Sequence, residues 1–209
     1  LESNAPYLIH EEGSIVKKAV RDMYNNEIEE IIVEGEESFK ACKEYMKALM
    51  PSHTKKVLPY VDNDLPLFQK FTIDSQLADI FKPTVTLKSG GYLVINHTEA
   101  LVAVDVNSGK ATKERSIENT ALRTNLEAAE EFAKQAKLRD LSGLIVIDFI
   151  DMEEHKNRHS VERKLRDSLK KDRARIQVGE ISNFGLLELS RQRLRPSVSE
   201  ISSVLCENC

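Results

Sequence analysis

Apolar and polar residues alternate over residues 101–107, which read LVAVDVN. Because successive side chains of a strand point to opposite faces, this alternation puts Asp105 and Asn107 on one face and three valines on the other. A leucine and an alanine share the face of the two polar residues, so Asp105 occupies a position where a core residue is expected. An ionised carboxylate there is costly unless a cation or dedicated donors balance it. The pattern therefore predicts a strand with a functional carboxylate near its end.

A second stretch, residues 143–151, has the same character. It reads GLIVIDFID, a continuous apolar run of strand length that ends in carboxylates, with Leu144, Val146 and Asp148 on one face. Between the two strands, an apolar stripe at helical spacing predicts a long helix over residues 116–139. A strand, a helix and a second strand suit a parallel pair, which would set Asp105 beside Asp148.

Two carboxylates at adjacent strand ends repel each other unless a divalent cation lies with them. Hard oxygen ligands with open positions favour Mg²⁺ or Mn²⁺ at Asp105 and Asp148. The alternative is that each aspartate only caps or turns the chain at the end of a buried strand, which is the commoner role of a single such residue. The two near-identical apolar runs that precede Asp105 and Asp148 favour the metal site.

The remaining pattern predicts further elements on both sides of this pair. Apolar spacing over residues 36–50 indicates a helix that Pro51 ends and that buries Cys42. Residues 52–65, with prolines at both ends and in the middle, are typical of an irregular surface connection. A helical piece is expected after Asp74, and a basic helix over residues 161–171. His155 and His159 then lie on a loop and at a solvated helix start. The expected strands are 31–33, 84–87, 92–96, 172–182 and 186–194.

One polar face of the long helix over residues 116–139 could serve a substrate. Asn119, Arg123 and Asn125 carry the polar groups that would point toward it. A solvated helix face with no functional role explains the same residues equally well.

Charge is spread unevenly along the 209 residues, whose net charge is −4. Residues 1–50 carry 6 Lys and Arg against 11 Asp and Glu, whereas residues 155–195 carry 12 against 5. A basic end beside two candidate metal ligands indicates a polyanionic partner. Arginine pairs bidentately with phosphate, so the candidates for holding the phosphate backbone of a nucleic acid are Arg173, Arg175, Arg191 and Arg193; the alternative for each is an ordinary solvent-exposed charge.

No apolar run approaches the length of a transmembrane helix, and residues 1–10 lack the form of a signal peptide. Three cysteines in a chain of this length do not make a disulfide framework, which indicates a reducing compartment. We therefore expect a soluble, cytoplasmic protein.

Three stretches together resemble the catalytic core of the RNase E/G endoribonucleases: ALVAVDVNSGKAT, IENTALRTNLEAAEEFAKQAKLRDLSGLIVIDFIDM and DRARIQVGEISNFGLLELSRQRLRPS. The match is dense from about residue 83 onward and looser upstream. The resemblance implies an α+β fold: a DNase I-like mixed sheet with flanking helices, preceded by a smaller, partial RNase H-like α/β unit. The implied divisions are 1–80 for the end of the sensor region and the RNase H-like part, 81–202 for the DNase I-like catalytic domain, and 203–209 for a zinc link.

The resemblance also implies roles for five residues. The family's metal-binding aspartates fall on Asp105 and Asp148, and its catalytic-site asparagine falls on Asn107. Its zinc-linking cysteines fall on Cys206 and Cys209. That implies one Zn²⁺ shared between two protomers, hence a zinc-linked dimer or, in the full-length protein, a tetramer. Here the residues between the cysteines depart from the family pattern, and the alternative is two free thiols.

The activity that the resemblance implies is magnesium-dependent endonucleolytic cleavage of single-stranded RNA, in mRNA decay and in rRNA and tRNA processing. The family's OB-fold domain and most of its 5′-end sensor lie before the region matched here, so we expect this stretch alone to be weak or inactive. Two other functions fit parts of the pattern. One is a non-catalytic RNA-binding or assembly module, and the other is a metal phosphoesterase acting on DNA or a nucleotide.

Overall fold

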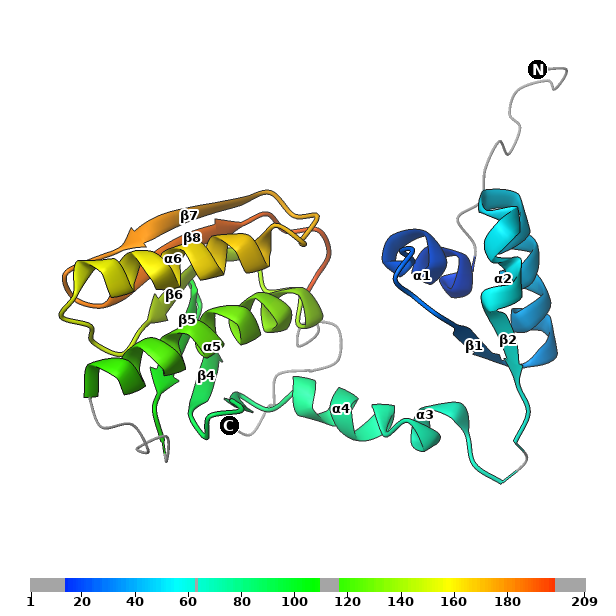
Figure 1. Cartoon of the computed structure of the whole chain (residues 1–209), viewed down its shortest axis with the longest axis horizontal. Coiled ribbons are helices and arrows are strands. Elements are labelled where there is room, and N and C mark those ends of the chain that lie inside the picture. The colour runs from blue at the N-terminus through cyan, green and yellow to red at the C-terminus, as the bar shows by residue number, and fades with distance from the viewer. Residues whose placement is uncertain (1–13, 63, 110–116, 198–209) are drawn as a thin grey trace, which may run out of the picture. The chain divides into compact units, whose positions relative to one another are not determined.

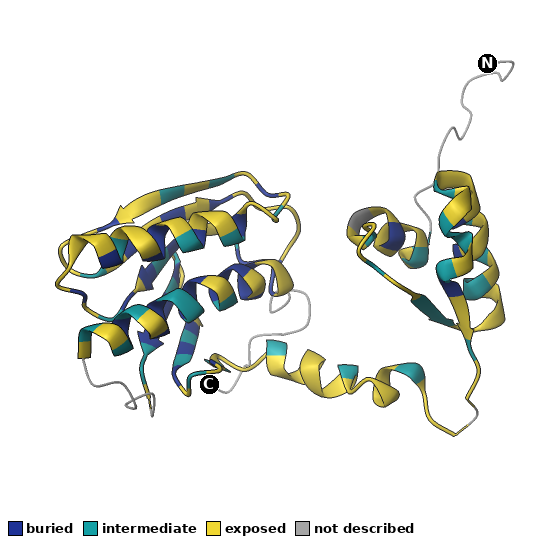
Figure 2. Ribbon diagram, in the orientation of Figure 1, coloured by how far each residue is buried: buried dark blue, intermediate teal, exposed yellow. Residues whose placement is uncertain are grey.

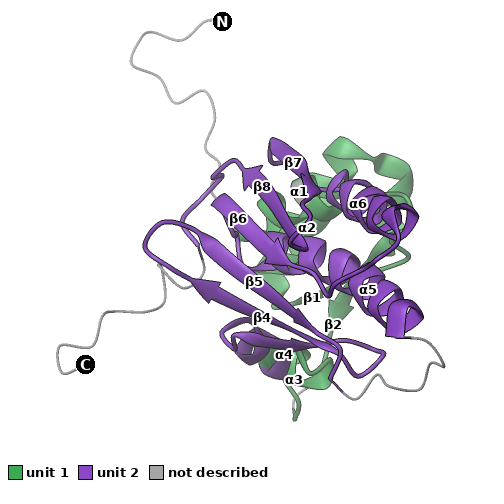
Figure 3. Cartoon of the chain, turned by 90° about the vertical axis from the view of Figure 1, so that its left-hand side faces the viewer, with its two compact units in different colours: residues 1–74 green, residues 75–209 purple. Residues whose placement is uncertain are grey.

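The computed structural model describes residues 14–62, 64–109 and 117–197 (Figure 1). The chain divides into two compact units, residues 1–74 and 75–209, coloured separately in Figure 3. None of the helices in the described ranges is long and apolar enough to cross a membrane.

The first unit is a small α/β arrangement around a two-stranded parallel sheet. Its elements are α1 (Ile15–Met23), β1 (Ile31–Glu34), α2 (Glu36–Leu49), the 3₁₀ helix η1 (Pro51–Lys56), β2 (Val57–Tyr60) and the short α3 (Leu67–Lys70). Strands β1 and β2 pair in parallel from Ile31 opposite Val57. Cys42 and Met46 of α2 are completely buried in the core of this unit, together with Val20 and Val57. The predicted strand, helix and buried cysteine are confirmed.

The prediction of an irregular connection over residues 52–65 is wrong for residues 52–60. Residues 51–60 form η1 and β2 instead. The proline within β2, Pro59, hides the strand in the sequence because it cannot donate a ladder hydrogen bond. β2 has β1 as its one neighbour in this sheet, and an edge strand tolerates the missing N–H.

The second unit is built on a six-stranded mixed sheet in the order β3-β4-β5-β6-β8-β7. Its strands are β3 (Thr84–Thr86), β4 (Tyr92–His97), β5 (Val102–Asn107), β6 (Gly143–Asp148), β7 (Ile176–Ile181) and β8 (Leu186–Arg191). Strands β5 and β6 run parallel, as predicted, and the other neighbouring pairs are antiparallel. The chain is therefore a mixed α+β protein.

Helices α5 (Ile117–Leu138) and α6 (His155–Leu169) pack on the same face of this sheet (Figures 1 and 3). A third helix, α4 (Ile73–Ile80), leads into β3. The core lies between the sheet and the helices α5 and α6, where Phe132, Ile145 and Leu165 are almost fully enclosed (Figure 2). α6 begins six residues before its predicted start, so His155 and His159 lie on the helix and are exposed.

The other face of the sheet is open within this unit. Along β5 and β6 buried residues alternate with accessible ones, and the accessible set includes Ala103, Asp105, Leu144 and Asp148. Leu144 is 46% exposed, whereas its neighbour Ile145 is 0% exposed. We call this accessible side the open face. Its residues come from alternate positions of β4, β5, β6 and β8.

Candidate active site on the open face of the sheet

Asp105 and Asp148 lie directly opposite each other at the C-terminal ends of the parallel strands β5 and β6. The register continues on both sides, so that Val94, Asp105, Asp148 and Leu186 form one row across four strands. Both carboxylates are exposed. The expectation that Asp105 takes the place of a core residue is therefore wrong, because the face it occupies is the open face.

Asn107 is tied to the first of these carboxylates. Its Nδ2 donates a hydrogen bond of 2.7 Å to Oδ2 of Asp105. The backbone at Asn107 is itself closely packed, since a side chain at Gly91 would meet the Asn107 carbonyl oxygen at 2.7 Å. Only glycine allows that approach. This contact fixes the backbone at the end of β5, from which the amide of Asn107 reaches Asp105.

The electrostatics of Asp148 reflect a crowd of negative charge. Partial burial, then the charge of Asp105 and then that of Asp151, raise the pKa of the Asp148 carboxyl above its usual value. Gly185 lies close to both Asp151 and Asp148, because a Cβ there would meet Oδ1 of Asp151 at 3.2 Å and Oδ1 of Asp148 at 3.9 Å. Its φ of +79° also favours glycine. Asp151 and Gly185 are thus parts of the site's edge that the sequence did not single out.

The loop over residues 149–154, which follows Asp148, is held to α5 by two side chains. Asn125 is 0% exposed and pairs with both backbone groups of Ile150, at 2.8 Å from Nδ2 to the carbonyl oxygen and 3.0 Å from the N–H to Oδ1. Glu118 accepts from the N–H of Glu153 at 3.0 Å and from Nδ2 of Asn157, which lies in the first turn of α6. Asn125 therefore positions the loop and does not face a substrate.

These residues can hold a hard cation. The two carboxylates, with the amide oxygen of Asn107 nearby, provide oxygen ligands of the kind that Mg²⁺ and Mn²⁺ prefer. The described residues contain no cluster of three or more His, Cys, Asp and Glu in metal-binding geometry. One or two carboxylates supplemented by waters and substrate phosphate are a usual environment for Mg²⁺. Mutual repulsion of Asp105 and Asp148 is relieved by such an ion.

Arg191, a predicted contact for RNA, is buried. Its side chain is 2% exposed, and it donates from Nε to Oδ2 of Asp172 at 2.8 Å and from Nη1 to the carbonyl oxygen of Leu141 at 2.7 Å. A guanidinium enclosed in this way cannot reach a phosphate, so the prediction for Arg191 is corrected: it is a structural residue.

The other three predicted arginines are exposed but lie far from the carboxylates. Arg175 precedes β7 and Arg193 follows β8, at the end of the sheet where Arg191 pairs with Gly143. β6 runs from there to Asp148 over five residue steps, or about 17 Å. Arg173 lies two residues before Arg175. All three arginines therefore lie at the end of the sheet opposite to Asp105 and Asp148.

The predicted zinc ligands, Cys206 and Cys209, lie outside the described residues. Their prediction remains as the sequence made it.

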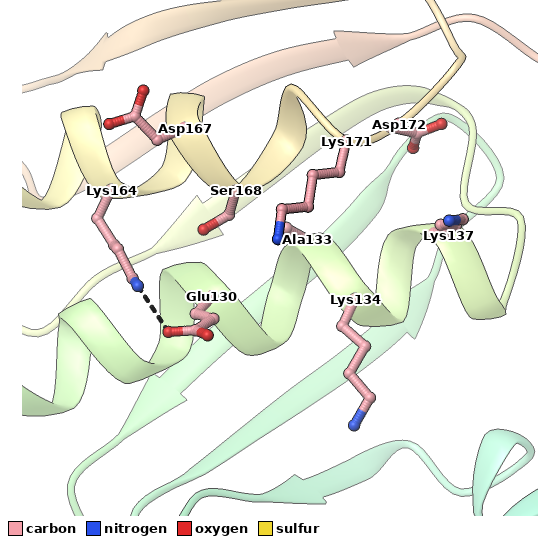
Figure 4. A pocket seen from close by; sticks show the side chains of 9 residues that line it. All are labelled: Glu130, Ala133, Lys134, Lys137, Lys164, Asp167, Ser168, Lys171 and Asp172. Atoms are coloured by element: carbon pink, nitrogen blue, oxygen red, sulfur yellow. Dashed lines mark ion pairs between the residues drawn. The ribbon is translucent and has the colours of Figure 1, made fainter. Parts of the chain in front are cut away.

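A groove of about 380 Å³ runs between α5 and α6 (Figure 4). Four lysines line it, and one of them, Lys164, forms an ion pair of 2.6 Å with Glu130 across the two helices. The groove belongs to the helix layer and so lies on the opposite side of the sheet from Asp105 and Asp148. It is therefore separate from the candidate active site.

Comparisons with known proteins agree with one another. Residues 1–194 match the model of the Ribonuclease E/G family. The chain is 47% identical to ribonuclease E of Haemophilus influenzae over 205 residues and 47% identical to that of Escherichia coli over 206 residues, in each case 98% of the chain. It is 34% identical to a chloroplastic ribonuclease E/G-like protein of Arabidopsis thaliana over 211 residues, which is 100% of the chain. It spans 22%, 19% and 21% of these three relatives.

Proposed function

Because the chain belongs to the ribonuclease E/G family, we propose that its open face carries the catalytic site of a magnesium-dependent endoribonuclease. The substrate is single-stranded RNA, and the processes served are mRNA decay and the processing of rRNA and tRNA. The observation that carries the proposal is the in-register pair of carboxylates, Asp105 and Asp148, on an accessible face of the sheet. In the same proposal the second unit is the family's DNase I-like domain, and the first is part of its RNase H-like domain.

The chemistry proposed is hydrolysis of a phosphodiester. Water adds to phosphorus, the P–O3′ bond breaks and a proton passes to O3′, which leaves a 5′-phosphate on the downstream fragment. When bound, Mg²⁺ or Mn²⁺ supplies a more acidic water and neutralises charge on the phosphate. Asp105 and Asp148 would hold the ion. Asn107 orients Asp105, because its N–H bond to Oδ2 leaves Oδ1 of that carboxylate for other partners.

Three further statements belong to this proposal. Cys206 and Cys209 provide two thiolates, half of a tetrahedral zinc site, so that two protomers share one Zn²⁺ and form a dimer. Zinc content per chain, beside the mass with and without chelator, tests that sharing.

The RNA backbone is held partly by Arg173, Arg175 and Arg193. The compartment is the bacterial cytoplasm or its organellar equivalent, which agrees with the sources of the relatives.

The test is to replace Asp148 by Asn, and separately Asp105 by Asn, in the full-length protein. Each variant keeps the shape of the side chain but loses its charge, and we expect single-turnover cleavage of single-stranded RNA in Mg²⁺ to fall by about 10³-fold or more. RNA binding and the melting temperature should stay near the wild-type values, since the change removes repulsion from an exposed site.

Glu188 provides a matched control. It is an exposed carboxylate on the open face, paired with Val146 one row away from Asp148. Glu188→Gln should cut at nearly the wild-type rate. Cleavage by Asp148→Asn at the wild-type rate would refute the assignment, and so would an equal loss in Glu188→Gln. A protein that binds RNA without cutting it would support an assembly module, and preferential cutting of DNA would support a different phosphoesterase.

A further inference from the structure

Phe184 is the most exposed of the seven phenylalanines, with 83% of its surface accessible. The next most exposed, Phe81 and Phe68, reach 54% and 53%. Phe184 lies in the tight turn over residues 182–185 that joins β7 to β8. An aromatic ring this accessible can offer a face to a stacking partner.

The turn that carries Phe184 is firmly held. Oγ of Ser182 accepts from the N–H groups of both Phe184 and Leu186 at 3.3 Å, and the N–H of Gly185 donates to the Ser182 carbonyl oxygen at 3.1 Å. Asn183 accepts from Nη1 of Arg158 at 3.5 Å, which ties the turn to α6. The backbone under the exposed ring is therefore fixed, and a ring presented in this way loses little entropy on binding.

The same turn borders the two carboxylates. The N–H of Phe149, the residue after Asp148, donates to the carbonyl oxygen of Gly185 at 3.1 Å. Oδ1 of Asp148 lies 3.9 Å from the point where a Cβ on Gly185 would be. Phe184 is one residue farther, a step of about 3.8 Å between Cα atoms. Phe184 therefore lies about the length of one nucleotide from Asp148, one of the candidate metal ligands.

The row across the sheet adds an apolar neighbour. Leu186 stands directly beside Asp148 in the register and is 37% exposed, so accessible apolar surface continues from the carboxylates toward the turn. A single RNA strand alternates charged phosphates with flat apolar base faces. The carboxylate pair suits the first through a cation, and the surface of Leu186 and Phe184 suits the second.

We infer that Phe184 stacks on the base of a nucleotide that flanks the scissile phosphate and so helps to select single-stranded RNA. The inference rests on the proposed function and names a residue that positions its substrate. A base in a duplex already stacks on neighbours at both faces, whereas an unpaired base can offer a face to the ring. Stacking on an aromatic side chain tolerates any base, so it selects the strand's unpaired state more than its sequence.

The test uses the full-length protein and a single-stranded RNA with one cleavage site. Phe184→Ala should lower kcat/KM by about 5- to 150-fold, the factor that base–aromatic stacking provides per base. Phe184→Trp should stay within a few fold of wild type, and Phe184→Leu, which is apolar but has no ring, should resemble Phe184→Ala. Leu138→Ala, an exposed apolar side chain 43% accessible at the end of α5, should cut like wild type.

An abasic residue placed in turn at each position around the cut gives the decisive comparison. With the wild-type protein, one flanking abasic position should reduce kcat/KM by the same factor as Phe184→Ala, and Phe184→Ala should lose nothing further on that RNA. In Asp148→Asn, which we expect to bind without cutting, the fluorescence of 2-aminopurine at that position should change on binding, and the added Phe184→Ala change should abolish the difference.

Two results would overturn the inference. One is wild-type cleavage by Phe184→Ala. The other is an equal loss by Phe184→Ala on intact RNA and on every abasic RNA, which would assign the ring to a contact with protein or to folding. Abasic scanning of the wild-type protein alone decides the matter if the variant fails to fold. Failure of the proposed function is a separate result, because Asp148→Asn would then cut normally.

Discussion

The two faces of the six-stranded sheet differ in how far their side chains are buried, although the same strands form both. Toward α5 and α6, β5 and β6 present Val104, Ile145 and Ile147, each at most 1% exposed. Toward the open face, alternate residues of the same strands present a carboxylate pair among partly accessible apolar groups. Stability and chemistry are therefore assigned to different sides of one layer, and a residue's phase in its strand decides which property its mutation disturbs.

The sharpest way to break this comparison uses two neighbours in β6. Ile145→Ala removes a fully buried side chain on the helix side and should lower the free energy of unfolding by about 2–5 kcal/mol. Leu144→Ala, at a position 46% exposed on the open face, should cost less than about 1 kcal/mol. Urea unfolding followed by circular dichroism measures both, since the chain has no tryptophan. Equal costs would mean that the open face is covered in solution.

A second prediction concerns the buried pair of Asp172 and Arg191. Burial raises the pKa of Asp172, but hydrogen bonds from Arg191 and from the N–H of Ala174, with the charge of Arg191, outweigh it and leave the pKa below its usual value. A lowered pKa in the folded state stabilises the protein above the unfolded pKa of about 3.9, and this contribution disappears as the pH falls through the folded pKa. Asp172→Asn should therefore cost about 1–3 kcal/mol at pH 7.

The pH dependence distinguishes this pair from ordinary surface charge. The difference in melting temperature between wild type and Asp172→Asn should shrink steadily as the pH falls below about 4. Asp167→Asn, which removes the partner of Lys170 in an exposed pair, should change the melting temperature much less. A difference between wild type and Asp172→Asn that is constant from pH 7 to pH 2.5 would contradict the prediction.

The smallest expected effect tests how far RNA extends along the sheet from the carboxylates. Arg175→Ala or Arg193→Ala should weaken RNA binding a few fold for any sequence and reduce the slope of log affinity against log salt by about 0.7 each. Filter binding at several salt concentrations measures the slope. Arg163, an exposed residue of α6 on the helix side, is the matched control. A larger change with Arg163→Ala would place RNA over the helix layer.

The sequence could predict the carboxylate pair because its cause is local. Two apolar strands separated by one helix connect in parallel, and each strand carries an aspartate near its C-terminal end, on the same face of the sheet. The open face could not be predicted in this way. A strand pattern tells which residues share a face, but whether a helix covers that face depends on where α5 and α6 pack.

The burial of Arg191 was predictable from the alternation of residues along β8. Leu187, Leu189 and Arg191 share one phase of β8, and both leucines are buried, so alternation alone puts Arg191 toward the core. Its partner Asp172 lies 19 residues earlier and could not be identified from spacing. Phe184 had no such signal, because an aromatic residue beside Asn and Gly in a turn reads only as part of a hairpin.

The attachment of the loop over residues 149–154 to α5 has a consequence for how the protein fails on heating. Asn125 and Glu118 belong to the helix that covers the core, and they hold the segment between Asp148 and α6 at both ends. A site on an untethered surface loop can unfold locally, so that activity is lost at a temperature where the helices are still folded. Here the segment that follows Asp148 is hydrogen-bonded to α5. Thermal inactivation and the loss of helical signal should therefore follow one curve.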